Sequence, residues 1–126
     1  MSPGHLPELI GIEILSVEAD SLLSRLAVRQ ELMAPNGYLH AGTVTTLADT
    51  TCGYGTMANL PEGARGFTTI ELKCNFLGSV REGTIYCQAA PVHLGRTTQL
   101  WDARVYSQET ERTLALFRCT QLILYA

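Results

Sequence analysis

The stretch AGTVTTLADTTCGYGTMA, residues 41–58, decides the fold of this 126-residue chain. Six threonines and three glycines make it a poor helix former, so burial rather than intrinsic preference must hold a helix here together. It contains no Lys, Arg, His or Glu, and therefore lacks the charged face of a surface helix. Its small and apolar side chains recur at spacings of three and four residues, the spacing of one helical face: Val44, Leu47, Ala48, Thr51 and Gly55. We predict a helix over residues 41–58 that is surrounded by sheet.

Segments that alternate apolar and polar residues flank this helix on both sides. Two precede it, beginning at Ile12 and Leu22, after a short helical turn over residues 6–10. Four follow it, over residues 68–76, 84–92, 97–106 and 113–124. In the first of these four, strict alternation predicts that Thr69 and Glu71 share a face. The order predicts an α+β fold in which a curled antiparallel sheet of five to six strands wraps around one central helix.

The length and composition indicate a single domain over residues 1–126 with much buried surface. Charged residues make up only 17% of the chain, below the roughly 25% of ordinary soluble domains, so we expect extra burial between subunits. The net charge of −3 and the scattered basic residues argue against nucleic-acid and anionic-membrane partners. The sequence has no apolar run of membrane-spanning length and no basic segment of a signal peptide, so we expect a cytoplasmic location.

The cysteines and histidines do not predict a metal site or a disulfide framework. The cysteines form no Cys-x-x-Cys pair and lie in apolar segments, which is typical of buried, reduced thiols: Cys52, Cys74, Cys87 and Cys119. The histidines have no ligand-type spacing: His5, His40 and His93. We expect neither a metal nor a cofactor.

Asp49 carries the most chemical information, because a carboxylate in a buried helix must be paired, hydrogen-bonded or functional. No basic residue lies in the same helix. One interpretation is that it accepts hydrogen bonds from neighbouring threonines: Thr45, Thr46 or Thr50. The other is that it acts as a general base or a nucleophile.

The predicted helix start offers a complementary group. Backbone amides at Ala41 and Gly42 can polarise a carbonyl oxygen through hydrogen bonds and the helix dipole. Gly42 precedes Asp49 by seven residues, or about 10 Å along a helix, which is too far for one subunit to use both groups. A second subunit could supply one of them, so we expect an active site between subunits. His40 either holds the loop before the helix or donates to a substrate carbonyl.

Residues 37–49, GYLHAGTVTTLAD, resemble the PaaI-type acyl-CoA thioesterases of the hotdog superfamily. The signature of that type is Gly-x-x-His-Gly-Gly, a short helical stretch, and then Asp or Glu. The resemblance extends to TTIELKCNFLGSVREG at 68–83 and HLGRTT at 93–98, and covers roughly residues 10–124. It implies a hotdog fold, an acyl-CoA substrate, no metal, and homodimers, often paired into tetramers, with active sites at the dimer interface.

The resemblance also implies roles for individual residues. Asp49 takes the place of the family carboxylate, which acts on water as a general base or attacks the thioester directly; the sequence does not separate these routes. The Ala41 amide would polarise the thioester carbonyl, His40 matches the neighbouring family His, and Thr69 falls where relatives carry a hydroxyl that holds water or substrate. Ala41 replaces a family Gly, which matters only if the position requires a positive φ.

Further substrate-binding residues are expected outside the helix. Ala34 stands where many relatives carry Asn or Gln, and Asn36 either substitutes for it or forms a turn. For the CoA end, the resemblance points to Arg81, Arg96, Thr97 and Thr98, although Arg96 is equally consistent with a solvated hairpin residue. We also expect Gly42 and Thr68 to bind the substrate.

Together these features favour a hydrolase that converts an aromatic or medium-chain acyl-CoA to the free acid and CoA. A hotdog dehydratase is a rival enzyme, but its site generally pairs a His with the acid in a different motif context. The alternative from another class is a non-catalytic acyl-CoA-binding hotdog protein. Loss of hydrolysis in an Asp49→Asn variant that still binds CoA would separate the enzyme from the binding protein.

Overall fold

The computed structural model describes residues 3–126 and contains the elements expected from the sequence, in the expected order. The chain begins with α1 (Leu6–Ile10), β1 (Glu13–Glu18), β2 (Ser21–Ala27) and the 3₁₀ turn η1 (Gln30–Leu32). The long helix α2 spans Ala41–Ala58, the predicted bounds. Four strands follow: β3 (Ala64–Phe76), β4 (Thr84–Leu94), β5 (Thr98–Ser107) and β6 (Thr113–Tyr125). Among residues 3–126, no helix is long and apolar enough to cross a bilayer.

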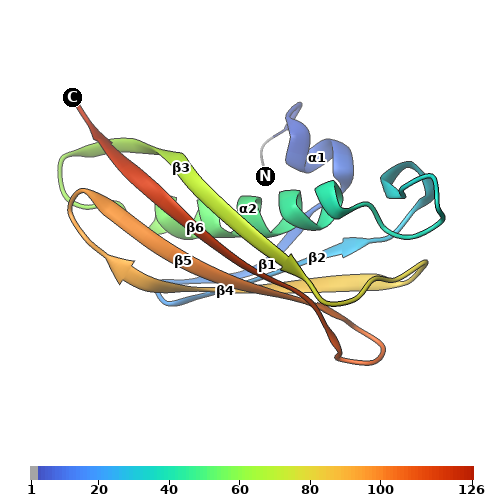
Figure 1. Ribbon diagram of the computed structural model, residues 1–126. Helices are drawn as coiled ribbons and strands as arrows, with labels where there is room; N and C mark the ends of the chain where they lie inside the picture. The colour runs from blue at the N-terminus through green and yellow to red at the C-terminus, as the bar shows by residue number, and fades with distance from the viewer. Residues whose placement is uncertain (1–2) are drawn as a thin grey trace.

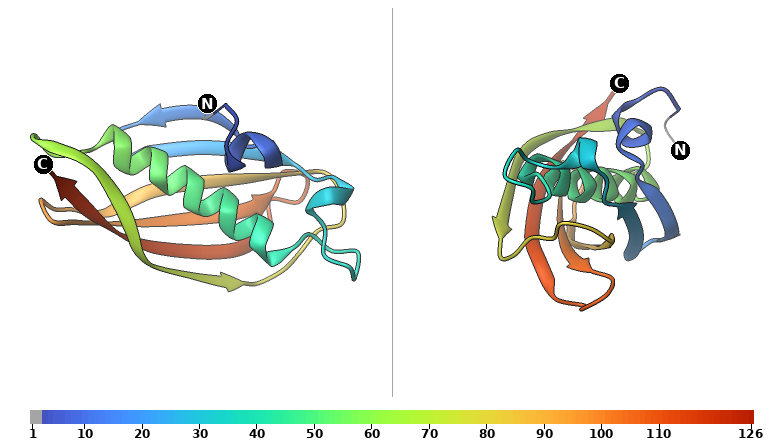
Figure 2. Two further views of the ribbon diagram at one scale, coloured as in Figure 1. Left: turned by 90° about the horizontal axis from the view of Figure 1, so that it is seen from above. Right: turned by 90° about the vertical axis from the view of Figure 1, so that its right-hand side faces the viewer.

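The six strands form one antiparallel sheet in the order β1-β2-β4-β5-β6-β3. The strands β2 and β3 follow one another in the sequence but lie far apart in the sheet, because α2 carries the chain across it. Figure 1 and Figure 2 show the sheet curving around α2, which lies diagonally across the concave face. The predicted α+β layout is therefore confirmed, with β1 and β3 at the two edges of the sheet.

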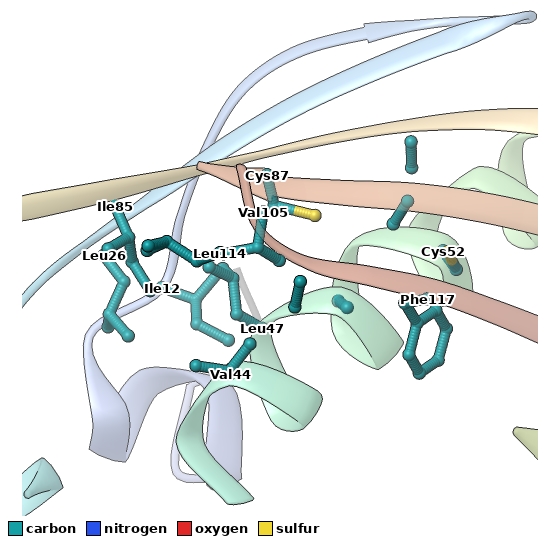
Figure 3. Packing of buried hydrophobic residues seen from close by; sticks show 14 of the residues in the cluster. Ile12, Leu26, Val44, Leu47, Cys52, Ile85, Cys87, Val105, Leu114 and Phe117 are labelled. Atoms are coloured by element: carbon teal, nitrogen blue, oxygen red, sulfur yellow. The ribbon is translucent and has the colours of Figure 1, made fainter. Parts of the chain in front are cut away.

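One face of α2 forms the core with the concave face of the sheet, as its residue spacing predicts. Figure 3 shows Val44, Leu47 and Cys52 of the helix packed among strand side chains such as Val105 and Phe117. All five are nearly or fully buried. Because each buried side chain of this size stabilises the fold by about 1–3 kcal/mol, packing offsets the poor helix propensity of α2.

A glycine lets α2 approach the sheet closely near its C-terminal end. A Cβ atom at Gly55 would lie 2.5 Å from two atoms of the Trp101 indole ring, well inside van der Waals contact. Trp101 is fully buried on β5, and its Nε1–H donates to the Gln99 side chain at 2.9 Å. The indole is therefore held in place, and the helix residue above it must lack a side chain.

The prediction that Thr69 and Glu71 lie on the same face of β3 is wrong. The pairing of β3 with β6 shifts between Thr69 and Glu71, so a β-bulge interrupts the alternation. Thr69 lies opposite the fully buried Gln121, whereas Glu71 lies opposite Thr120 on the outer face. The two residues therefore point to opposite faces, and the Thr69 side chain lies on the same face of the sheet as α2.

The cysteines are free, as expected. Cys52, Cys87 and Cys119 are buried, and Cys74 is half-buried on β3. Burial raises the pKa of the Cys87 thiol to about 12, even though hydrogen bonds to Thr51 and Ser24 lower it. These thiols belong to the core, and the raised pKa keeps the Cys87 thiol protonated at neutral pH.

Candidate active site

His40 caps the N-terminus of α2 with its ring. Its backbone is extended, with φ −66° and ψ 136°, and its Nδ1 accepts the backbone N–H of Gly42 at 2.7 Å. An imidazole that accepts through Nδ1 carries its proton on Nε2 when neutral, so the exposed ring presents a donor away from the helix. This bond places His40 at the start of the helix. The Gly42 amide was expected to bind a carbonyl oxygen, but its N–H donates to the His40 ring instead.

The amide of Ala41 is the free donor at this end of the helix. Among residues 3–126 it has no hydrogen-bond partner, and Ala41 is exposed. Ala41 does not have a positive φ, so the alanine fits the backbone in place of the family glycine. Ala41 borders an open hollow of about 640 Å³ between the loop before α2 and residues 76–79. A carbonyl oxygen entering there could accept from the Ala41 N–H.

Asp49 lies two turns further along α2 and has no hydrogen-bond or ion-pair partner among residues 3–126. It is half-buried, its Oδ1 is sealed from solvent, and within the described part of the chain no hydrogen bond or ion pair reaches it. Thr45 and Thr46 donate instead to helix carbonyls, those of Ala41 at 3.0 Å and Gly42 at 2.8 Å. The interpretation that threonine hydroxyls occupy the carboxylate is therefore wrong in this chain. Burial raises the pKa of Asp49 above the ordinary value of 3.8.

The loop before α2 contains a side-chain turn at Asn36. The Asn36 Oδ1 accepts the backbone N–H of Tyr38 at 3.0 Å, and the Tyr38 carbonyl accepts the N–H of Ala34 at 2.7 Å. Asn36 is thus a turn residue, the second of the two interpretations of its sequence position. Ala34 and Asn36 both border the hollow beside the Ala41 amide.

Arg81 lies at the same end of the molecule as the helix start. Its guanidinium stacks 4.4 Å from the centre of the Tyr38 ring and donates to the Tyr38 hydroxyl at 3.1 Å. The neighbouring Val80 carbonyl accepts the N–H of Leu39, which ties this loop to the loop before α2. Arg81 borders a separate hollow of about 230 Å³ beside the β5–β6 loop, and its exposed guanidinium is suited to a phosphate.

Arg96, Thr97 and Thr98 lie at the other end of α2. The β4–β5 turn that holds them is fixed there by the Tyr125 hydroxyl, which donates to the Arg96 carbonyl at 2.5 Å. The next strand residue, Gln99, reaches the Asn59 carbonyl just beyond the C-terminus of α2. One chain therefore does not bring this turn together with Arg81.

Thr68 and Thr98 are also separated from Asp49, by the sheet itself. Both lie opposite Leu122 of β6, on the outer face of the sheet. That face has its own hollow of about 530 Å³, bordered by Lys73, Asp102 and other residues that no sequence argument singled out.

Thr69 has a partner that sequence reasoning missed. Its hydroxyl donates to the Gln121 Oε1 at 2.6 Å, and Gln121 is fully buried on the inner face of β6. The Nε2 of the same amide is buried without a hydrogen-bond partner in residues 3–126. A signal was present in the sequence, since Gln121 is a polar residue on a strand face whose neighbouring residues Phe117, Cys119 and Ile123 are apolar.

Two groups in this arrangement can act on a carbonyl compound. Asp49 is an unpartnered carboxylate that can take a proton, and the Ala41 amide is a free donor that can stabilise an oxyanion. They lie on the same helix, eight residues and about 12 Å apart, so one chain cannot apply both to one carbonyl group. Within residues 3–126, no group of three or more His, Cys, Asp or Glu side chains is placed to hold a metal ion.

Comparisons with known proteins agree on the chemistry. The family model described as "Thioesterase superfamily" matches residues 36–114. A 1,4-dihydroxy-2-naphthoyl-CoA hydrolase of Listeria monocytogenes is 35% identical to this chain, over 91% of this chain and 92% of its own length. The crystal structure of the thioesterase HI1161 from Haemophilus influenzae superposes with a TM-score of 0.90 at 27% identity, covering 98% of this chain and 85% of that one. The hotdog fold is therefore confirmed.

The expected similarity to the PaaI type in particular is supported only by a solved structure. The PaaI protein of Escherichia coli superposes with a TM-score of 0.83 at 24% identity, over 94% of this chain and 83% of its own. At that identity the similarity shows a common fold only.

Proposed function

Because this chain belongs to the thioesterase superfamily, it is a thioester hydrolase, and we propose that its substrate is the CoA thioester of an aromatic acid. Residues 1–126 form one catalytic domain in this proposal. The observation that carries the choice of catalytic residue is the state of Asp49: a half-buried carboxylate with a raised pKa, a sealed Oδ1 and no partner among residues 3–126. A fold does not maintain such a group for stability, because leaving it unpaired costs free energy.

In the proposed reaction Asp49 acts as a general base. It takes a proton from a water molecule, and the water oxygen bonds to the acyl carbon. The negative charge that develops on the carbonyl oxygen is stabilised by the N–H of Ala41. The carbon–sulfur bond then breaks, the thiolate of CoA leaves, and Asp49 passes the proton that it took from water to the sulfur. Direct attack by the carboxylate, followed by hydrolysis of the resulting anhydride, is the other route consistent with the same geometry.

The proposal requires a homodimer, since one chain cannot bring Asp49 and the Ala41 amide together. The edge strand β3 supports this assembly: its Ile70, Leu72 and Phe76 side chains are 57%, 44% and 47% exposed. An unpaired strand edge with exposed apolar side chains favours pairing with a second copy about a two-fold axis. Antiparallel pairing of two β3 strands would direct the two α2 helices in opposite senses and bring each Asp49 toward the partner's helix start.

Such pairing would also explain where the expected CoA-binding residues lie. Arg81 and the turn containing Arg96 stand at opposite ends of one chain. In a two-fold dimer with antiparallel helices, Arg81 of one subunit comes toward the turn of the other. We further propose that two dimers pair through their outer sheet faces, where Leu116, Leu122 and Leu124 are 49%, 36% and 41% exposed.

The aromatic acyl group is proposed from the relative that shares 35% identity, whose name specifies a naphthoyl thioester. The length of that alignment, over nine-tenths of both chains, supports a pocket of similar extent. The assignment to the PaaI type, made on the spacing of His40 and Asp49, is a proposal of the same kind. A medium-chain aliphatic acyl group is the second substrate class to test.

Release of CoA thiol from a panel of acyl-CoA thioesters tests the function directly. We expect hydrolysis of aromatic thioesters by the wild-type chain and a loss of about 10³-fold or more in kcat for Asp49→Asn. Asp102→Asn is the matched control, because Asp102 is a carboxylate on the outer face, bound by Arg118 at 2.6 Å and 2.8 Å. This control should keep wild-type activity.

Two results would contradict the proposal. Equal activity of wild type and Asp49→Asn would remove the carboxylate from the mechanism. Binding of acyl-CoA without turnover of any thioester would support the non-catalytic binding protein instead.

A further inference from the structure

The hollow on the outer face of the sheet collects three of the nine basic residues of the chain. Its volume is about 530 Å³, within the range of small-molecule sites, and it is bordered by Lys73, Arg104 and Arg118. These residues lie on the adjacent strands β3, β5 and β6, on the face turned away from α2 (Figure 2). Among the described residues a single acid, Asp102, borders the hollow, so its lining is positive although the chain has a net charge of −3.

Strand pairing brings these side chains together. Lys73 and Asp102 both lie directly opposite Arg118, so the three residues form one row across the sheet. Arg104 lies two residues along β5 from Asp102, on the same face and about 7 Å away, which long side chains can bridge. The row continues on β4 with Ala90, which lies opposite Asp102 and has only a methyl group. The hollow is therefore a recess among longer, mostly cationic side chains.

The two guanidinium groups are fixed in position but retain free donors. The Nε and Nη2 of Arg118 donate to the two Asp102 oxygens at 2.6 Å and 2.8 Å. The Nε of Arg104 donates to the Thr113 hydroxyl at 2.6 Å, and its Nη2 donates to the Glu111 carbonyl at 2.7 Å. In residues 3–126 the Nη1 of neither arginine has a hydrogen-bond partner. A guanidinium already held in place loses little freedom when an anion binds to it.

Lys73 has a like charge beside it and no acid to offset it. Within the described part of the chain it forms no ion pair, and the residue directly opposite is Arg118. Like charges opposite each other on neighbouring strands are destabilising. Asp102 is already bound through both oxygens, and Glu71, one row away on β3, does not border the hollow. An anion between Lys73 and the free Nη1 groups would offset this repulsion.

We propose that the outer-face hollow binds a small molecule through a phosphate or diphosphate group. Such a group has about two negative charges at neutral pH and several acceptor oxygens, which suits three cationic side chains set around a recess with one acid. The site does not depend on thioesterase activity, but its role in assembly rests on the pairing of dimers through this face proposed above. Pairing would bring two positive hollows together, so a bound anion favours pairing, and pairing strengthens anion binding by the same factor.

Calorimetric titration of the full chain tests the site. The ligands are pyrophosphate and adenosine diphosphate, with the ionic strength held constant by potassium chloride because salt screens exposed charges. We expect saturable binding with a Kd of about 1 mM or below. Equal affinity for the two ligands would assign the phosphate groups alone, and tighter binding of adenosine diphosphate would assign a nucleotide; both results support the site.

Three variants show whether binding occurs in this hollow. Lys73→Gln should weaken binding about tenfold, the effect of one charge-assisted hydrogen bond. Arg65→Gln is the matched control, since it removes the same charge from an exposed position of β3 that does not border the hollow, and it should bind as wild type does. Asp102→Asn removes the opposing charge and should bind about threefold more tightly.

Three outcomes would overturn the site: no saturable binding of either ligand, unchanged binding in Lys73→Gln, or equal weakening in Lys73→Gln and Arg65→Gln. The last result would show attraction by overall charge rather than by the hollow. Lys73 is exposed, so we expect its variant to fold as wild type does, which circular dichroism will check.

Sedimentation velocity separates the site from its role in assembly. Pyrophosphate should raise the fraction of tetramers in wild type and have little effect on Lys73→Gln. Binding without a change in mass would refute the role in assembly and leave the site in place. Neither measurement uses a thioester, so failure of the proposed hydrolase activity would leave both results standing.

Discussion

Replacing Ala41 by proline removes one amide hydrogen from the proposed site and changes little else. Ala41 is the first residue of α2, where proline is well tolerated because the amide at that position bonds to no helix carbonyl. The preceding residue, His40, has φ −66° and ψ 136°, the extended conformation that a residue before proline favours. We therefore expect Ala41→Pro to change the free energy of unfolding by less than about 0.5 kcal/mol.

The activity of Ala41→Pro should fall far more than its stability. Loss of one oxyanion donor lowers kcat by about 10²–10³-fold, or roughly 3–4 kcal/mol of transition-state stabilisation. KM should change little, because the donor acts on charge that develops only during the reaction. Thiol release measures the activity and thermal unfolding measures the stability. Ala41→Gly is the matched variant, since it keeps the amide and should keep most of the activity.

Mixing two inactive variants tests whether the site is shared between subunits. In a heterodimer of Asp49→Asn and Ala41→Pro, one site loses both groups and the other has both intact. Random reassociation makes about half of the dimers mixed, so the mixture should recover about a quarter of wild-type activity. No recovery, with heterodimers demonstrated by mass spectrometry, would refute a site that combines Asp49 of one subunit with the Ala41 amide of its partner.

Four further outcomes are expected from the structure. The rate of hydrolysis should fall as the pH drops through the raised pKa of Asp49, at a pH above the ordinary aspartate value of 3.8, as pH–rate profiles will measure. Because the folded state holds that proton more tightly than the unfolded state, wild type should lose stability relative to Asp49→Asn as the pH rises through the same pKa; denaturant titrations across that range check the sign. Gly55→Ala should lower the free energy of unfolding by about 1–2 kcal/mol in thermal melts, because overpacking against Trp101 outweighs the gain of roughly 1 kcal/mol in helix propensity. In the native protein a thiol reagent should label Cys74 before the three buried cysteines, and rapid labelling of Cys87 would show that the core opens more readily than its packing suggests.

The architecture could be predicted from local patterns. Alternating residues predicted six strands, and the spacing of small residues in 41–58 predicted α2 with its observed bounds. These patterns are strong because most inward positions are apolar or small when a sheet packs on one helix; Gln99 and Gln121 are exceptions. The strand order could not be read in the same way, since pairing between β3 and β6 depends on contacts between residues far apart in the chain.

The chemistry of the candidate site was predicted only in part. Asp49 was recognisable because its helix contains no other charged residue, and the structure adds that no threonine hydroxyl occupies it. His40 was assigned two alternative roles, and its bond to Gly42 shows that it caps the helix. The catalytic roles themselves stay predictions until the variants are measured.

By itself the sequence determined which segments become helix and strand and which carboxylate is left without a charged neighbour, because both depend on residues within a few positions of each other. Only the tertiary structure decided the surroundings of Thr69. A bulge turns its side chain toward α2, and the register with β6 places it against Gln121, 52 residues away. Such contacts follow from backbone pairing between distant strands, and a one-residue shift in that pairing reverses which face each side chain occupies.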